Sequence, residues 1–272
     1  MSQIQIQGGK PLNGRVELSG AKNLVTKAMV AALLGDTPSE LRDVPKISDV
    51  EVVQRLLELH GVKINFSDDG VMQLDPTNVK SARMVDIDAH AGSSRIPILF
   101  CGPLLHQLGE AFIPDLGGCH IGDRPVDFHL EVLRNFGAVI EKLPNGTRMS
   151  APNGLKGAKI SLPYPSVGAT ENIMTAAVLA KGVTTIDNAA REPDIVDLGE
   201  FLISMGAKIE GLGSPLITIT GVKVLQPTDH TTITDRIITG TWAFAAAMTR
   251  GDITIHGARA EHLELPLEKL AS

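Results

Sequence analysis

Four short segments of the chain are apolar on nearly every helical face: KAMVAALL, ILFCGPLL, IMTAAVLA and WAFAAAMT. A helix that is apolar all round has to be surrounded by protein. Between these segments lie stretches such as AKIEGLGSPLITITGV, in which polar and apolar residues alternate. Alternation is typical of strands that face water on one side. The pattern therefore predicts an α/β protein built as an inside-out barrel, in which buried helices are enclosed by outer sheets.

The pattern recurs as an internal repeat of about 70 residues. Residues 31–64 align without a gap to residues 176–209. A third copy lies between them, and its last part, residues 126–140, has the same pattern of helix, glycine and strand. Each copy reads as an apolar helix, a short strand, an amphipathic helix closed by glycine, and then alternating strands. Three copies predict one pseudo-threefold domain over residues 22–229.

A fourth copy begins at TGTWAFAAAMT. We expect residues 1–21 and 230–272 to form an incomplete second domain of the same type. The final segment, LELPLEKLAS, reads as an unfinished amphipathic helix, so the chain is expected to stop inside a repeat. An ordinary flexible C-terminus is the alternative.

Composition narrows the functional class. The chain has 272 residues, 43% of them hydrophobic, and a formal net charge of -6. Its Lys and Arg residues are scattered, which argues against nucleic acid as a partner. No apolar run reaches the roughly 18 residues that span a bilayer, so we expect no membrane partner and a soluble, cytoplasmic protein. Two cysteines do not make a disulfide framework, and free thiols suit a reducing compartment.

A short polar turn precedes each of three apolar helices: SGAKN, GSSR and PSVGAT. Helix N-termini present unpaired N–H groups and a partial positive charge, which suit phosphate or carboxylate groups. Lys22 and Arg95 add full charges at two of these turns. The alternative is that the serines of these turns only cap the helices that follow: Ser19, Ser94 and Ser166.

The loop GGCHIGDRPVD places a cysteine in polar, glycine-rich surroundings. Cys101 lies within an apolar helix and reads as a packed core residue, whereas Cys119 has no apolar periodicity around it. The neighbouring His120 and Arg124, together with Lys22, would lower the pKa of Cys119 and favour a thiolate or general acid. The sequence contains neither a phosphate-binding P-loop nor metal-ligand spacing, so we expect no cofactor and no metal. A hydrolase stays formally open.

The chain resembles the enolpyruvyl transferases that act on UDP-N-acetylglucosamine in five segments: LSGAKN, GGCHIGDRPVD, RPVDFH, SVGAT and NAAREPDIVDLGEFLISMGAKI. The repeat alone would also fit the 3-phosphoshikimate enolpyruvyl transferases or RNA-cyclase-like folds. The resemblance implies two inside-out domains that close over a cleft and, at full length, a monomer. It also implies transfer of the enolpyruvyl group of phosphoenolpyruvate to the sugar 3-hydroxyl, with release of phosphate, as the first committed step of peptidoglycan synthesis.

The resemblance also implies roles for individual residues. Lys22, Arg95 and Arg124 would clamp phosphoenolpyruvate, and Cys119 would be the loop acid that fosfomycin alkylates. The residues implied to bind the UDP-sugar are Asn23, Arg124, Pro125, Val126, Asp127, Ser166, Val167 and Gly168.

The sequence also departs from the family pattern. The aspartate that activates the sugar hydroxyl, and a further arginine, would lie beyond residue 272, so we expect this chain alone to have little activity. Asp235 and Arg236 match a family segment, but Thr239 stands where the family has an acidic residue, and Tyr164 and Pro165 precede SVGAT where some members carry lysine. A non-catalytic module that binds UDP-N-acetylglucosamine, and a 3-phosphoshikimate enolpyruvyl transferase, are the alternatives.

Overall fold

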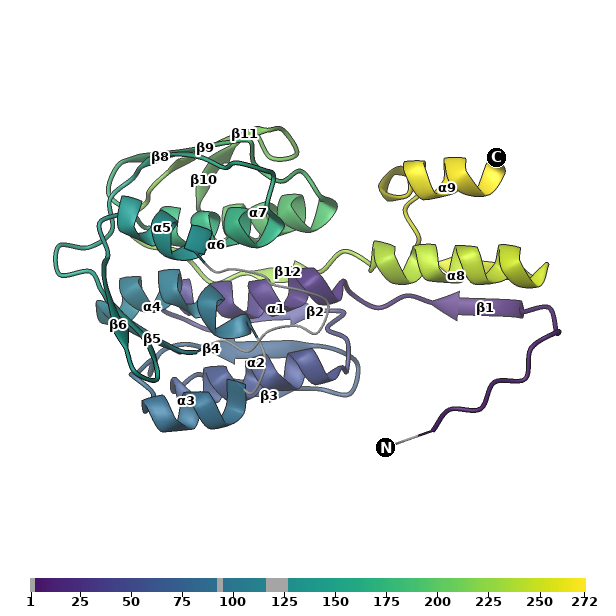
Figure 1. Cartoon of the computed structure of the whole chain (residues 1–272). Helices are drawn as coiled ribbons and strands as arrows, with labels where there is room; N and C mark the ends of the chain where they lie inside the picture. The colour runs from purple at the N-terminus through teal and green to yellow at the C-terminus, as the bar shows by residue number, and fades with distance from the viewer. Residues whose placement is uncertain (1–2, 92–94, 116–126) are drawn as a thin grey trace.

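The structure is a computed structural model, and it describes residues 3–91, 95–115 and 127–272 (Figure 1). Within them, three units follow one another in the same order: a central helix, a strand, an outer helix and two strands. The first unit comprises α1 (Lys22–Ala31), extended by the 3-10 turn η1 (Ala32–Leu34), then β2 (Ser39–Arg42), α2 (Ser48–Leu59), β3 (Lys63–Phe66) and β4 (Met72–Asp75).

The other two units repeat this order, each with one additional element at its start, α3 (Met84–Ala91) in the second and β8 (Lys159–Ser161) in the third. The second contains α3 (Met84–Ala91), η2 (Ile96–Phe100), α4 (Cys101–Leu108), β5 (Glu110–Pro114), α5 (Asp127–Asn135), β6 (Val139–Leu143) and β7 (Gly146–Ser150). The third contains β8 (Lys159–Ser161), α6 (Val167–Ala177), β9 (Val183–Asp187), α7 (Pro193–Ser204), β10 (Lys208–Glu210) and β11 (Leu216–Thr220). The element order therefore reproduces the repeat expected from the sequence.

Each unit contributes one outer sheet, and the last strand of the series returns to the first unit. The sheet orders are β12-β2-β4-β3, β5-β7-β6 and β10-β11-β9-β8. Strand β12 (Asp229–Thr231) pairs in parallel with β2, so residues far apart in the sequence share a sheet. This pairing joins the end of the third unit to the beginning of the first.

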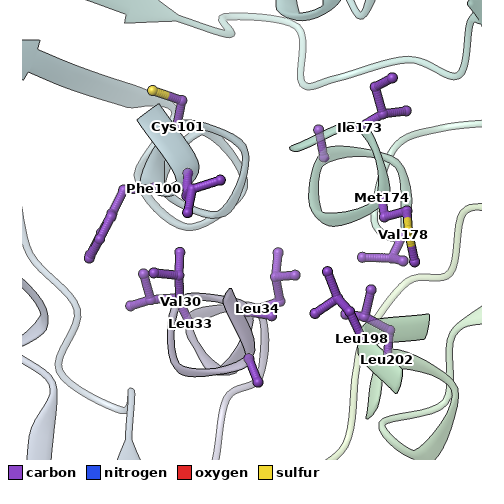
Figure 2. Close-up of a cluster of buried hydrophobic side chains, with 14 of the residues drawn as sticks. Val30, Leu33, Leu34, Phe100, Cys101, Ile173, Met174, Val178, Leu198 and Leu202 are labelled. Carbon is purple, nitrogen blue, oxygen red and sulfur yellow. The ribbon is translucent and has the colours of Figure 1, made fainter. Parts of the chain in front are cut away.

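The central helices form the core of the three units. Figure 2 shows buried side chains of η1, η2, α4, α6 and α7 side by side, among them Leu33, Phe100, Met174 and Leu202. Helices α4 and α6 approach very closely, because an added Cβ at Gly102 would lie 3.1 Å from the Cα of Ala176. The mixed fold with buried central helices that the sequence predicted is confirmed.

The remaining elements form a smaller group beside the three units (Figure 1). They are β1 (Asn13–Glu17), α8 (Arg236–Thr249), β13 (Asp252–His256), η3 (Ala260–His262) and α9 (Glu264–Ala271), and β1 pairs in parallel with β13. The division into a domain of residues 22–229 and a second domain stays a prediction. No helix in the described ranges combines the length and the apolar character needed to cross a membrane.

The expectation that all four apolar helices are enclosed is wrong for α8. Only Thr239 and Gly240 of this helix are buried, and the side chain of Met248 is 84% exposed. Strand β13 and α9 pack against α8, but among the described residues nothing encloses the other side of the helix. The sequence pattern states which residues favour burial, whereas burial itself requires neighbouring elements.

The close approach of α4 and α6 makes a glycine substitution a sharp test of the core. In Gly102→Ala the new methyl group would press on the backbone of α6 at Ala176. We expect the free energy of unfolding to fall by about 1–3 kcal/mol, the usual cost of overpacking. Urea denaturation followed by circular dichroism measures this change.

Gly240→Ala in α8 is the matched control. A Cβ there would make an ordinary contact, 3.7 Å from a methyl carbon of Leu263. Since alanine favours the helix over glycine by roughly 0.5–1 kcal/mol, this variant should be unchanged or slightly more stable. Equal destabilisation of both variants would contradict the close packing of α4 on α6.

Candidate functional site

A cavity of about 530 Å³ lies at the N-terminal ends of the central helices. Each unit contributes to its wall: the start of α1, the residues around the start of η2, and the first turns of α6. The cavity is lined by Lys22, Asn23, Thr26, Lys27, Asp49, Arg95, Ile96, Ile98, Leu99, His129, Val167, Gly168 and Glu171. Segments that are far apart in the sequence thus meet at one opening.

The structure brings together several of the residues singled out in the sequence. Lys22, Asn23, Arg95, Val167 and Gly168 all line this cavity. Ser166 lies directly before Val167, and Asp127 is an exposed residue at the start of α5 that does not line the cavity. Four candidate site residues lie outside the described residues, namely Cys119, Arg124, Pro125 and Val126, and so do the capping candidate Ser94 and the neighbour His120.

Lys22 lies at the start of α1, where its backbone and side chain have different partners. Its backbone N–H donates to Oδ2 of Asp235 at 3.1 Å, so this N–H is occupied. Its ammonium lies 3.1 Å from Oδ2 of Asp49 on α2, and both side chains are partly exposed. An exposed ion pair adds little stability. At Lys22, the ammonium rather than the backbone N–H is therefore the group that can bind an anion.

The N-terminus of α6 is capped by its own serine. The hydroxyl of Ser166 accepts a hydrogen bond from the N–H of Ala169 at 3.3 Å, so the capping interpretation is confirmed for this residue. Helix α1, by contrast, begins after Ala21 without a side-chain cap, so Ser19 does not cap it. The first turn of α6 directs the positive end of its dipole toward the cavity.

His129 of α5 packs against this helix end. A Cβ on Gly168 would lie 3.4 Å from Cε1 of His129, an ordinary van der Waals contact, so the imidazole lies directly beside this first turn. Burial, together with the positive charge of Arg95, lowers the pKa of His129 to about 4. The imidazole is therefore neutral near pH 7 and adds no positive charge to the cavity.

Glu171 on α6 and Lys27 on α1 were missed in the sequence. The Glu171 side chain is 2% exposed, and Oε1 lies 3.8 Å from Nζ of Lys27. Burial raises the pKa of Glu171 to about 7, although Lys27 opposes this shift. A charged residue in an otherwise apolar helix could have identified both positions in the sequence. Lys27 is the first residue of KAMVAALL, and Glu171 lies within SVGATENIM.

The arrangement is suited to holding anions. Lys22, Lys27 and Arg95 bring cationic groups from two units to one cavity, and charge-assisted hydrogen bonds from such groups are the strong ones in phosphate recognition. Across the described ranges, no cluster of three or more His, Cys, Asp or Glu residues is arranged to hold a metal ion. The cationic groups of this wall are suited to binding and orienting phosphate or carboxylate groups.

Comparison with known proteins gives one family. A family model described as EPSP synthase (3-phosphoshikimate 1-carboxyvinyltransferase) matches residues 6–271. The UDP-N-acetylglucosamine 1-carboxyvinyltransferase of Corynebacterium efficiens is 47% identical over 266 residues, which cover 97% of this chain and 62% of the relative. The enzyme of the same name from Azorhizobium caulinodans is 46% identical and is covered to 65%. The chain thus spans less than two thirds of the length of these relatives.

Solved structures share the fold. The enolpyruvyl transferase NikO from Streptomyces tendae superposes with a TM-score of 0.82 at 20% identity, over 98% of this chain and 63% of that chain. An EPSP synthase from Acinetobacter baumannii gives a TM-score of 0.69 at 18% identity, over 88% of this chain and 53% of the other. At these identities the likeness concerns the fold alone.

Cys101 provides a test of the packed core. The thiol is fully buried within the core, and burial raises its pKa above the usual range, so the reactive thiolate is suppressed. We expect iodoacetamide to leave Cys101 unmodified in the native protein and to label it in urea, as measured by peptide mass spectrometry. Rapid labelling of Cys101 under native conditions would contradict its assignment as a core residue.

Proposed function

The chain belongs to the EPSP synthase family of enolpyruvyl transferases, and from this premise we propose that its cavity binds UDP-N-acetylglucosamine and phosphoenolpyruvate. The proposed reaction is transfer of the enolpyruvyl group to the sugar 3-hydroxyl with release of phosphate. A role in peptidoglycan synthesis and a cytoplasmic location belong to the same proposal. The relatives that are 42–47% identical carry the UDP-N-acetylglucosamine name, which favours this substrate over 3-phosphoshikimate.

One observation supports the proposal above the others. Lys22 from the first unit and Arg95 from the second line the same cavity, beside the N-terminus of the central helix of the third. Phosphoenolpyruvate carries a phosphate and a carboxylate, and both groups need fixed cationic donors. Such donors also stabilise the charge that develops on a departing phosphate, because they are already oriented when the bond breaks.

The proposal assigns different described residues to the two substrates. Lys22 and Arg95 are proposed to hold phosphoenolpyruvate. The side-chain amide of Asn23 is suited to a sugar hydroxyl, and Val167 and Gly168 at the start of α6 are suited to the diphosphate. Ser166 supports this helix end as its cap.

Other residues are proposed from the family resemblance alone. Cys119 is proposed as the acid that protonates the enol carbon or assists phosphate release, and Arg124 as a further phosphate ligand. Pro125, Val126 and Asp127 are proposed to contact the UDP group. Asp235 is not proposed as the base for the sugar hydroxyl, because it already accepts N–H bonds from Lys22, Ile237 and Ile238.

A binding module without turnover is the second candidate. The observation that favours it is the chemistry of the cavity wall, whose described cationic groups and helix N-terminus are suited to binding and orienting anions. Such a module would hold the UDP-sugar with α1 and α6 and would release no phosphate. Binding and turnover must therefore be measured separately.

Isothermal titration calorimetry with UDP-N-acetylglucosamine and phosphoenolpyruvate tests the binding proposal. We expect Arg95→Met to weaken phosphoenolpyruvate binding at least about 10-fold, because hydrogen bonds to charged groups contribute roughly 1.5–3 kcal/mol. Lys22→Met should behave similarly. A parallel phosphate-release assay decides between the transferase and the binding module.

Lys208→Met is the matched control. Lys208 is exposed on β10 and does not line the cavity, so its loss removes the same charge without touching the site. Equal affinity of wild type, Arg95→Met and the control would refute the anion site. Tighter binding of 3-phosphoshikimate than of UDP-N-acetylglucosamine would point instead to the shikimate-type transferase.

A further inference from the structure

Two charged side chains of the cavity wall have no part in the proposed function as described so far. Lys27 lies on α1, beyond Lys22, and Glu171 lies on α6, one turn after Val167. Their charged groups are 3.8 Å apart, and their side chains are 18% and 2% exposed. Both are therefore deep in the wall, where charges are costly unless they are compensated.

Glu171 is poorly compensated. Neither of its carboxylate oxygens has a hydrogen-bond partner among the described residues. A buried carboxylate without hydrogen bonds favours its neutral form. Glu192 and Asp194, at the start of α7, act in the same direction because their negative charges also disfavour ionisation. Among the described residues, the positive charge of Lys27 is the one that favours the ionised form of Glu171.

The effect of protonating Glu171 on the charge of the cavity wall depends on the other charged groups that line the cavity. Lys22 is paired with Asp49, Arg95 contributes a positive charge, and His129 is neutral near pH 7. While Glu171 is ionised, it offsets the charge of Lys27. Once Glu171 is protonated, the wall carries one more uncompensated positive charge.

We propose that Lys27 is a further anion-binding residue of this cavity, and that Glu171 is a positioning residue that takes up a proton when a dianion binds. The proton comes from solvent and converts the carboxylate to the neutral acid. Lys27 is then free to pair with the bound dianion. This inference rests on the proposed function in one respect, since the dianion that the cavity binds is taken to be the phosphate group of phosphoenolpyruvate.

The sign of the pH dependence follows from linkage. A bound dianion disfavours a second negative charge nearby, so it raises the pKa of Glu171 above its value of about 7 in the free protein. Affinity is then highest at pH 6, where Glu171 is protonated in both states, and falls as pH rises through 7 and 8. One unit of additional pKa shift corresponds to about a tenfold fall in affinity.

Sulfate is the probe, because it remains a dianion across this range whereas phosphate groups titrate. Its binding to the whole chain is followed by NMR titration at pH 6.0, 7.0 and 8.5. Calorimetry in buffers of different ionisation enthalpy reports the protons taken up. We expect affinity to fall on the order of tenfold from pH 6.0 to 8.5, with a fraction of one proton taken up per sulfate near pH 7.

Two variants separate the roles of the pair. Glu171→Gln keeps the shape of the side chain and should remove both the pH dependence and the proton uptake, while affinity at pH 6.0 stays close to that of wild type. Lys27→Met should lower affinity at pH 6.0 by about tenfold, because it removes a charge-assisted contact. A merely structural role of Glu171 would leave the proton uptake of a folded variant unchanged.

Glu110→Gln is the matched control. Glu110 is also paired with a cation, Arg148 at 2.9 Å, but it is more exposed and does not line this cavity. It should retain the wild-type pH dependence. Wild-type affinity that is independent of pH, proton uptake that persists in Glu171→Gln, or no saturable sulfate site would each overturn the proposal.

The proposed function and the role of the Lys27–Glu171 pair are tested by separate measurements. Sulfate binding with proton uptake but no affinity for UDP-N-acetylglucosamine would support the pair and refute the proposed substrate. Affinity for both substrates with pH-independent sulfate binding would refute the role of the pair and leave the proposed function supported.

Discussion

The cavity depends on how closely the central helices pack. Helix α4 approaches α6 at Gly102, where a methyl group would meet the backbone at 3.1 Å, and buried side chains from η1, α6 and α7 fill the remaining core (Figure 2). Because the helices lie together, their N-terminal ends lie together as well. Lys22, Arg95 and Gly168, which belong to three different units, thereby line one opening. A wider helix spacing would separate the same charges.

Placing several positive charges in one cavity wall has an electrostatic cost, and an acidic residue beside each lysine reduces it. Like charges in a partly buried wall repel, so each lysine has an acidic neighbour: Asp49 for Lys22 and Glu171 for Lys27. The two pairs differ in solvation. Asp49 is 38% exposed, whereas Glu171 is 2% exposed and lacks hydrogen bonds among the described residues. The buried pair is consequently the one whose charge state is balanced near neutral pH.

The sequence was sufficient for the repeat and for part of the cavity, for a physical reason. Hydrophobic periodicity reports local structure, and the repeat places a polar turn before each of three apolar helices. That Lys22 and Arg95 hold one ligand together was an implication of the family resemblance. Hydrophobic periodicity does not report which side of an apolar helix faces a cavity. Glu171, within the segment SVGATENIM, was therefore not predicted as a cavity residue. Nor does it report whether neighbours exist to cover a face, which is why α8 was expected to be enclosed although Met248 is 84% exposed.

Asp235 links the cavity to the elements beyond the three units. One of its oxygens accepts the N–H of Lys22 at the start of α1, and the other accepts the N–H groups of Ile237 and Ile238 at the start of α8. A single buried carboxylate therefore caps α8 and fixes it to the residue that lines the cavity. Arg236, 3.5 Å from Asp194 of α7, adds a second connection at the same point. Since Asp194 also acts on Glu171, the position of α8 and the charge of the cavity wall share one electrostatic network.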